Sequence, residues 1–579
     1  MAAKARERLN PVQLTPQSRI DDFTAQGWWG DLTLDHWLQR NRAEVPDRLA
    51  LVDPPNRSDL DGATPRRFTW AELGTEVDRV AAALLDTGLR KDDVLTYQLP
   101  NVADTVILAL ACSRIGLIIS PVVMPYRAHE LGFVIDKVRP SAVITVARFA
   151  GHDHAEMALA LTGERNCKVL VLGGDTPRGA YDLDAAIAVA DPARAAAYHD
   201  AQPMQPGEVF TIFWTSGTEA RPKGVPRDQN HWIVNAKMVA EAADIREAEV
   251  LLNPFPLVNI GSFGLVTPWL MKRGTLVLHH PFDLKIFLTQ IAAERVNYTI
   301  AAPAILNALL KTPGLLSSVD LSSLRAIGSG SAPLSPWMIE GFAQDHGIEV
   351  CNIYGSNEGA SLFSDARQVP DHHDRARYFP RMGVAGIDWP GSESSAMIQT
   401  RLVDLDTEQD ITEPLRPGEL RFQGAATFGG YFESPEISAN AFDASGFYRT
   451  GDLFEIAGDT APHRFYRFVG RCKDIIVRGG VNISPAEIDD LLAGHPALKE
   501  AAVVGIPDDR LGERMCVAAV PADDQAPDLA AISTWLKDQG LAVFKLPELL
   551  VTVDALPRNA MNKVSRRDLR ETVLAMLAP

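Results

Sequence analysis

The sequence predicts an α/β fold with a large N-terminal domain of several subdomains and a small α+β C-terminal domain. Three observations predict it. The chain has 579 residues, 46% of them hydrophobic, which is enough for several cores. Helical and β-branched patterns alternate from about residue 68, as in α/β folds with parallel strands. The pattern restarts near residue 475 with about 105 residues left, so we expect domains at 1–472 and 473–579.

The first alternating unit begins with a helix. Thr69 and Glu72 form a capping-box pattern ahead of apolar residues at helical spacing, and Gly88 ends this helix. Further strand patterns at 94–99, 117–123 and 142–146 enclose helical patterns through residue 111 and near 129–137. This order favours strand–helix–strand units with parallel pairing.

The C-terminal part repeats the alternation on a smaller scale. A strand pattern at 475–477 leads to the turn Gly479-Gly480. Ser484, Pro485 and Glu487 then combine an N-cap, a proline at the first helical position and a capping-box glutamate. A strand at 501–506, a helix near 529–536 and a last helix after Ser565 complete the expected domain.

The composition disfavours several classes of protein. The 56 basic and 74 acidic residues give a net charge of −18, without a basic stripe for nucleic acid. Five scattered cysteines without a CxxC spacing disfavour a disulfide framework and a zinc site. The N-terminus lacks the apolar run of a secretory signal, so we expect a cytoplasmic protein. The apolar run at 106–124 contains Arg114, Gly116 and Pro121, which favours a buried helix and strand over a transmembrane segment.

A loop rich in hydroxyl groups and glycine follows the apolar run at 209–214. Its backbone N–H groups, hydroxyls and the ammonium of Lys223 could bind a polyphosphate, although a surface turn has a similar composition. A Walker A loop is excluded at two positions. Pro222 stands where the second glycine should be, and Gly224 stands where the hydroxyl residue should be.

The segment from Thr215 to Gly224, Thr-Ser-Gly-Thr-x-x-x-Pro-Lys-Gly, closely resembles the phosphate loop of the adenylate-forming superfamily. This superfamily includes acyl- and aryl-CoA ligases, the adenylation domains of peptide synthetases, and beetle luciferases. Other segments resemble its further motifs in the same order, at 326–334, 353–359, 448–453, 469–488 and 556–566. The resemblance covers roughly residues 68–569 and implies an AMP-binding large domain and a mobile small domain that carries a catalytic lysine.

The resemblance also implies roles for individual residues. The expected nucleotide contacts are Thr215, Ser216, Gly217, Thr218, Lys223, Ser331, Ala332, Pro333, Asn352, Tyr354, Gly355, Asn357, Asp452 and Arg471. Lys563, Glu358 and Thr218 are the expected catalytic residues, and Glu358 is the expected Mg²⁺ ligand. Lys473 corresponds to the hinge, and Gly479 and Gly480 to the loop that replaces Lys563 in the thiol step.

The implied chemistry explains why such groups are needed. A carboxylate does not react with a thiol, because the leaving group would be an oxide. Attack on the α-phosphate of ATP makes that oxygen part of AMP, which leaves readily, and the protein neutralises charge around this displacement. A lysine suits the position of Lys563 because it is a mobile point charge. The expected cofactors are therefore ATP, Mg²⁺ and coenzyme A.

Several positions depart from the usual motifs. Glu219 and Ala220 replace a hydroxyl residue and a glycine in the phosphate loop. Asn357 replaces a threonine that contacts phosphate, and it can still form hydrogen bonds. Asn562 replaces the glycine before the lysine, and asparagine tolerates a left-handed backbone well.

The acyl site is predicted from position and polarity. Asn259 stands where many members carry a histidine, and Phe263 and Gly330 are the other expected substrate contacts, although aromatic residues at such spacing are more often core. Residues 251–270 carry few charges, which favours an apolar fatty, alicyclic or steroid or terpenoid acid.

Two other functions are compatible with the sequence. The acyl group could pass to the phosphopantetheine arm of a carrier protein in place of coenzyme A, although no carrier domain is recognisable in the chain. A catalytically degenerate nucleotide- or acyl-binding regulator is a further alternative, suggested by Glu219, Ala220 and Asn357. The sequence leaves a homodimer open.

Overall fold

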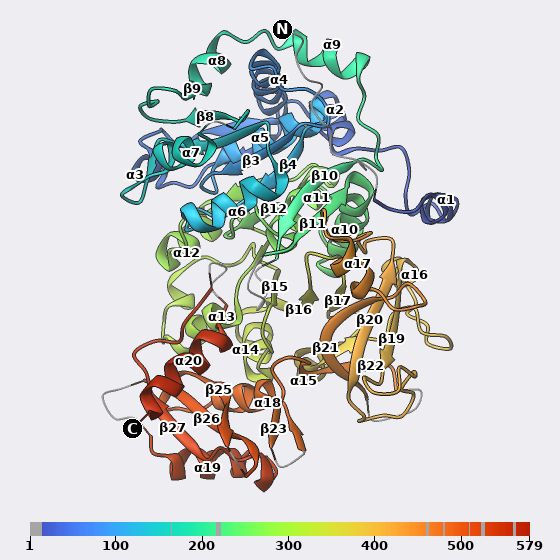
Figure 1. The fold of residues 1–579 in the computed structure, drawn as a ribbon, viewed down its shortest axis with the longest axis vertical. Helices are drawn as coiled ribbons and strands as arrows, with labels where there is room; N and C mark the ends of the chain where they lie inside the picture. Colours follow the sequence, from blue (N-terminus) through green and yellow to red (C-terminus); the bar gives the residue numbers. More distant parts are fainter. Residues whose placement is uncertain are drawn as a thin grey trace.

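The computed structural model describes residues 14–163, 165–215, 222–458, 463–478, 481–508, 510–522, 527–559 and 563–578. Four large sheets organise these residues, and Figure 1 shows three of them in the large domain and the fourth at the C-terminal end. The predicted α/β fold with a large and a small domain is confirmed.

A seven-stranded sheet forms the N-terminal end of the molecule (Figure 1). Its order is β11 (Gly224–Asp228), β10 (Val209–Trp214), β4 (Ile118–Pro121), β3 (Val94–Gln98), β5 (Ala142–Val146), β8 (Lys168–Leu172) and β9 (Tyr181–Asp182). The associated helices include α4 (Trp70–Asp86), α5 (Ala103–Ile115), α6 (Ala128–Val138), α7 (His154–Thr162) and α8 (Leu183–Val189). Strands β10, β4, β3, β5 and β8 run parallel, so their carboxyl ends share one edge with the start of the phosphate loop.

The predicted start of helix α4 is confirmed in detail. Thr69 N–H donates to Glu72 Oε2 at 2.8 Å, and Glu72 N–H donates to Thr69 Oγ1 at 3.2 Å, which closes the capping box of α4. The apolar run at 106–124 forms the buried α5 and β4. Within the described ranges, no helix has the length and apolar character that a bilayer crossing requires.

An eight-stranded sheet lies beside the first. Its order is β17 (Ser361–Ser364), β16 (Glu349–Gly355), β15 (Ala326–Gly330), β14 (Tyr298–Ile300), β12 (Val250–Asn253), β13 (Thr275–Leu278), β1 (Leu49–Val52) and β2 (Arg67–Thr69). Its helices include α10 (Gln229–Ala242), α11 (Ile260–Met271), α12 (Leu284–Ala293), α13 (Pro303–Lys311) and α14 (Pro336–His346). Trp70 of α4 stacks on Trp269 of α11 with ring centroids 5.0 Å apart, so one hydrophobic core joins the two sheets.

A five-stranded antiparallel sheet completes the large domain. Its order is β18 (Tyr378–Pro380), β22 (Phe465–Arg471), β21 (Tyr448–Ala457), β20 (Gly418–Gly424) and β19 (Ile398–Val403). The short helices near it are α15 (His372–Arg377), α16 (Ser394–Met397) and α17 (Pro435–Ala441). The sequence patterns did not predict this sheet.

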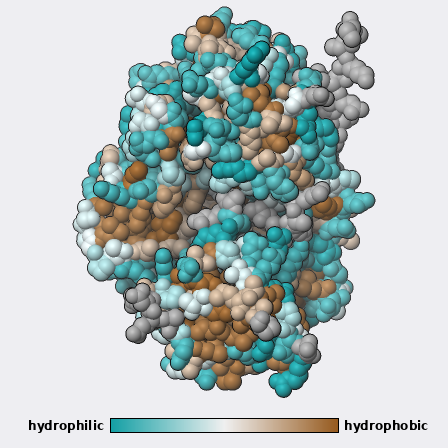
Figure 2. All heavy atoms as spheres, turned by 60° about the vertical axis from the view of Figure 1, so that its left-hand side comes forward, coloured by the Kyte–Doolittle hydropathy of each residue, from teal (hydrophilic) through white to brown (hydrophobic). Residues whose placement is uncertain are grey.

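The small domain has its own sheet and its own cores. The strands are β24 (Val481–Ile483), β23 (Ile476–Arg478), β26 (Gly512–Pro521), β25 (Leu498–Asp508) and β27 (Leu549–Thr552), and the helices are α18 (Pro485–Ala493), α19 (Leu529–Asp538) and α20 (Arg566–Leu577). Figure 2 shows hydrophobic side chains gathered on this lower part of the molecule, and α20 exposes Leu574, Met576 and Leu577.

One detail of the predicted small domain is wrong. Helix α18 begins at Pro485 as predicted, but the Ser484 side chain forms no capping hydrogen bond. Its hydroxyl instead lies against Gly470 of the large domain. The approach is so close that a Cβ added to Gly470 would lie 2.7 Å from Ser484 Oγ. Ser484 thus contributes to the contact between the domains.

Candidate active site

A buried carboxylate joins the second and third sheets. Tyr354 at the end of β16 donates from its hydroxyl to Asp452 Oδ2 at 2.7 Å. Arg471 lies opposite Asp452 in the β21–β22 pairing, with Nε 3.2 Å from Asp452 Oδ1. Burial raises the pKa of Asp452, and Arg471 and Tyr354 oppose the rise. We call these three residues the Asp452 cluster.

Lys563 of the small domain lies close to this cluster. Its side chain remains exposed, but surrounding protein displaces part of its water and lowers its pKa. The Arg471 charge lowers the Lys563 pKa further, and Asp452 opposes this. Asn559 holds the lysine backbone, because its N–H donates to the Lys563 carbonyl at 2.8 Å and its Oδ1 accepts from the Lys563 N–H at 3.1 Å.

Glu358 lies in a tight loop between β16 and β17. Its side chain is buried, and Glu358 Oε1 accepts a hydrogen bond from the Tyr431 hydroxyl at 2.9 Å. The Phe428 N–H donates to the Glu358 carbonyl at 2.9 Å, and Gly359 follows with φ +95°. A carboxylate at this position could share a magnesium ion with phosphates, which is how Mg²⁺ is usually held.

The Asn357 side chain has a structural role that the sequence did not indicate. Its Nδ2 donates to the Trp214 carbonyl at 3.2 Å, and its Oδ1 accepts from the Ile260 N–H at 3.0 Å. The amide therefore links the end of β10 to the start of α11. The amide has a second N–H on Nδ2, so the predicted phosphate contact stays a prediction beside this structural role.

Two hydrogen bonds join the residues at the two ends of the predicted phosphate loop, Thr215 and Lys223. Thr215 N–H donates to the Lys223 carbonyl at 2.9 Å, and Lys223 N–H donates to Thr215 Oγ1 at 3.1 Å. The Lys223 ammonium lies 5.1 Å from the centroid of the Tyr431 ring. Predicted residues outside the described part of the chain are Ser216, Gly217, Thr218, Gly479 and Gly480, with the departures Glu219, Ala220 and Asn562.

Two further nucleotide predictions have different outcomes. Ser331, Ala332 and Pro333 are exposed, and Ser331 has φ +73°, a strained conformation that often marks ligand sites. Asn352 is instead buried, and its Nδ2 donates to the carbonyls of Arg375 at 3.1 Å and Ala376 at 2.9 Å. These bonds fix the orientation of the Asn352 amide, and its contact with adenine stays a prediction. Gly355 lies exposed at the end of β16.

The predicted substrate residues are mainly structural. Asn259 caps α11, with its Oδ1 accepting from the Ser262 N–H at 3.0 Å. Phe263 is 1% exposed and packs 4.7 Å from the Trp232 ring, so it belongs to the core and does not line an open site. Gly330 must be glycine because a Cβ there would lie 2.0 Å from the Ile353 carbonyl oxygen. The substrate contacts expected of Asn259, Phe263 and Gly330 stay predictions.

Lys473 lies in a turn between β22 and β23. The Asp474 N–H donates to the Arg471 carbonyl at 3.1 Å, and the Cys472 N–H donates to the Gly451 carbonyl at 2.9 Å. The Lys473 side chain is exposed. This turn directly follows Arg471 of the Asp452 cluster, and the hinge role of Lys473 stays a prediction.

Sequence comparison assigns these features to a known family. The AMP-binding enzyme family model matches residues 38–432, and the model of the AMP-binding enzyme C-terminal domain matches residues 487–563. The chain belongs to the AMP-binding enzyme family.

Individual relatives cover nearly the whole chain. A medium-chain fatty-acid–CoA ligase of Escherichia coli is 29% identical over 99% of this chain and 96% of its own length. A feruloyl-CoA synthase of Amycolatopsis sp. is 30% identical over 91% of this chain and 97% of its own. ATP-bound MatB from Rhodopseudomonas palustris superposes with a TM-score of 0.77 and 25% identity, covering 94% of this chain and 100% of that one. The chain is thus an AMP-forming acid–thiol ligase that uses ATP, Mg²⁺ and coenzyme A.

The described residues fit ATP and Mg²⁺. The Asp452 carboxylate can accept hydrogen bonds from hydroxyl groups, and Tyr354 presents an aromatic ring at the same place. Within the described ranges, no three His, Cys, Asp or Glu side chains gather as a metal site. Glu358 would therefore hold Mg²⁺ together with phosphate oxygens, as Mg²⁺ commonly binds.

The sequence patterns did not predict two residues that lie beside the expected site residues. Tyr431 contacts Glu358 and Lys223, and Arg227 lies fully buried with its Nη1 donating to the Asn357 carbonyl at 3.1 Å. Burial lowers the pKa of Arg227 to about 10, and Asp228 and Glu358 oppose the decrease. An arginine beside an aspartate in the sequence, as Arg227 is beside Asp228, is usually exposed, which is why its burial was not predictable.

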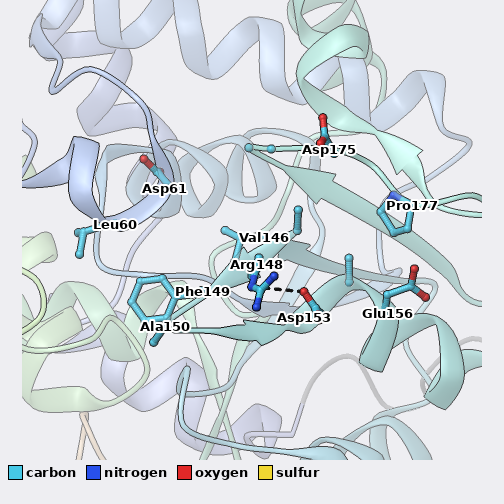
Figure 3. A pocket seen from close by; sticks show the side chains of 14 residues that line it. Leu60, Asp61, Val146, Arg148, Phe149, Ala150, Asp153, Glu156, Asp175 and Pro177 are labelled. Atoms are coloured by element: carbon cyan, nitrogen blue, oxygen red, sulfur yellow. Dashed lines mark ion pairs between the residues drawn. The ribbon is translucent and has the colours of Figure 1, made fainter.

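A cavity elsewhere in the large domain contains none of the predicted site residues. It has a volume of about 530 Å³ and lies at the ends of β5 and β8 (Figure 3). Figure 3 shows Arg148 beside Asp153, with the two groups 3.6 Å apart. Four carboxylates line the cavity, those of Asp61, Asp153, Glu156 and Asp175, and this charge disfavours a polyphosphate.

Docking of the small domain is expected to depend on pH through Asp490 of α18, which packs against β22. Burial raises the pKa of Asp490 to about 6, Arg377 of the large domain opposes the rise, and Asp489 adds to it. An acid with a raised pKa takes up a proton on docking. Docking is therefore favoured as pH falls through 6 and is weakened above it.

We expect interdomain energy transfer between two dyes to report more docking at pH 5.5 than at pH 8. Asp490→Asn should flatten this dependence, because the uncharged amide removes the titrating group. Asp538→Asn, an exposed position on α19, is the matched control and should keep the wild-type profile. An unchanged profile in Asp490→Asn would show that another group controls docking.

Proposed function

We propose that the chain is an ATP-dependent carboxylic acid–CoA ligase whose substrate is an apolar acid of the fatty, alicyclic or steroid or terpenoid kind. The observation that carries this proposal is the polarity around α11. No charged residue occurs between Val250 and Met271, and the Asn259 side chain is used as the helix cap. An amino acid substrate would require a carboxylate for its ammonium group, and this segment offers none.

The relatives support an apolar acyl group without defining it. The names of two of them include a medium-chain fatty acid and a feruloyl group, which share a carboxylate attached to a largely apolar body. In this chain Val258, Ile260 and Ile353 lie around the start of α11 and the end of β16. These side chains favour hydrophobic contact with the substrate over ion pairing.

The first half-reaction needs charge neutralisation at three places. Bound MgATP would supply the electrophilic α-phosphorus and the AMP leaving group. The Asp452 cluster orients the nucleoside, and Lys223 and Glu358 act on the polyphosphate and its metal. Lys563 stabilises the negative charge between the attacking carboxylate and the α-phosphate.

The second half-reaction needs Lys563 to leave. We place the domain boundary at residues 472 and 473, so that rotation at the turn around Lys473 removes the lysine and admits the Gly479-Gly480 loop. Arg471 and Asp474 flank this turn, and the Asp474 N–H donates to the Arg471 carbonyl at 3.1 Å. The segment that connects the two sheets is therefore short. The same turn therefore couples departure of Lys563 to access for the thiol.

The function is tested by pyrophosphate release with ATP and Mg²⁺. A panel of fatty, alicyclic, steroid and aromatic acids is assayed with and without coenzyme A, and the thioester is detected by mass spectrometry. Release that rises with coenzyme A, together with an acyl-CoA product from an apolar acid, is the expected result. Pyrophosphate release without a thioester would point to a carrier-protein acceptor. Absence of pyrophosphate release with every acid would contradict an active ligase.

A further inference from the structure

One side chain contacts two charged groups that the proposed mechanism assigns to the polyphosphate. Tyr431 follows β20, and its hydroxyl donates to Glu358 Oε1 at 2.9 Å. The face of its ring lies 5.1 Å from the Lys223 ammonium. The residue is 8% exposed, so both contacts are largely shielded from water.

Tyr431 is itself held firmly. Its N–H donates to Ser438 Oγ on α17 at 2.9 Å, and its ring packs edge-on against Phe428 at 4.9 Å. The pKa of Tyr448 is raised by burial first, then by the Glu358 charge and by Tyr431, so a second phenol lies on the same network. The position of Tyr431 is therefore set by the fold before any ligand binds.

We propose that Tyr431 is a positioning residue that orients Glu358 for Mg²⁺ and polyphosphate and contacts Lys223 through the face of its ring. This inference rests on the function proposed above. A carboxylate that accepts a hydrogen bond from a fixed hydroxyl keeps a defined orientation. The ring attracts the ammonium by a cation–π interaction, so one side chain positions both charged groups.

The two contacts come from different parts of the side chain, so they can be separated by mutation. Tyr431→Phe removes only the hydroxyl and keeps the ring. It should therefore loosen Glu358 while leaving the Lys223 contact intact. Loss of a group that orients a metal ligand typically weakens metal affinity by about 10–100-fold.

The readout is binding of ATP measured by calorimetry, so the identity of the acid is not needed. In Tyr431→Phe we expect the Mg²⁺ concentration for half-maximal enhancement of ATP binding to rise about tenfold. ATP affinity in EDTA should stay at the wild-type value, because the ring still holds Lys223. Tyr466→Phe is the matched control, because it also removes a buried tyrosine hydroxyl. The Tyr466 hydroxyl lies 3.2 Å from Thr400 Oγ1 within the five-stranded sheet.

A double-mutant cycle gives a second measurement. In a Glu358→Gln background the Tyr431→Phe change should no longer alter the Mg²⁺ dependence, because the carboxylate it orients is gone. Equal effects of Tyr431→Phe with and without Glu358, or no difference from Tyr466→Phe, would overturn the proposal. A wild-type protein whose ATP binding is independent of Mg²⁺ would instead contradict the proposed function itself.

Discussion

Lys563→Ala is expected to slow acyl-adenylate formation by about 10²–10³-fold, the usual cost of losing one group that stabilises transition-state charge. The lysine lies within electrostatic reach of Arg471 and Asp452, and the proposed function places it beside the α-phosphate. Thioester formation from supplied acyl-adenylate should be largely unchanged, because the proposed mechanism removes the lysine from the site before this step. Single-turnover measurements of each half-reaction separate the two effects.

The matched control is Lys537→Ala, an exposed lysine on α19 of the same domain. It removes the same charge without touching the docked site, so both half-reactions should keep their wild-type rates. Equal loss of both half-reactions in Lys563→Ala would refute the assignment. It would show that Lys563 supports the domain itself and not the adenylation step.

The sequence predicted which residues lie together better than it predicted the contacts of each side chain. Tyr354, Asp452 and Arg471 stand far apart in the chain, yet the structure brings their side chains together. Tyr354 and Arg471 lie at the ends of β16 and β22, and Asp452 lies opposite Arg471 within β21. The resemblance of these motifs to one family therefore predicted that the three residues belong together.

Side-chain roles that depend on contacts were less predictable. Asn259 caps a helix, Asn357 bridges two elements, and Phe263 packs in the core. A polar amide or an aromatic ring has the same local pattern whether it meets a ligand or another part of the fold. Only the three-dimensional neighbours distinguish the two uses.

The five-stranded sheet escaped prediction for a related reason. Its antiparallel strands contain buried charged residues, such as Arg421, which is fully buried and lies 2.8 Å from Glu419. Such pairs break the alternation of polar and apolar residues by which strands are recognised. They are stable only because each charge has a partner within the sheet.

Gly359→Ala is expected to destabilise the large domain by about 3 kcal/mol or more and to disable the Glu358 site. Gly359 has φ +95°, and an added Cβ would lie 1.9 Å from the Ala426 carbonyl oxygen. Backbone on both sides of this contact must therefore move. Because Glu358 is the preceding residue, its carboxylate would be displaced from Tyr431, and urea unfolding together with Mg²⁺-dependent ATP binding measures both consequences.

Gly386→Ala separates backbone strain from the close contact. Gly386 also has positive φ, +79°, but an added Cβ there meets nothing within 4 Å. It should cost only about 1–2 kcal/mol, the penalty for a left-handed backbone, and should leave Mg²⁺-dependent ATP binding intact. If the two variants lost equal stability, conformation alone would explain Gly359. A much larger loss in Gly359→Ala would show that the approach of the Ala426 backbone is what requires glycine beside Glu358.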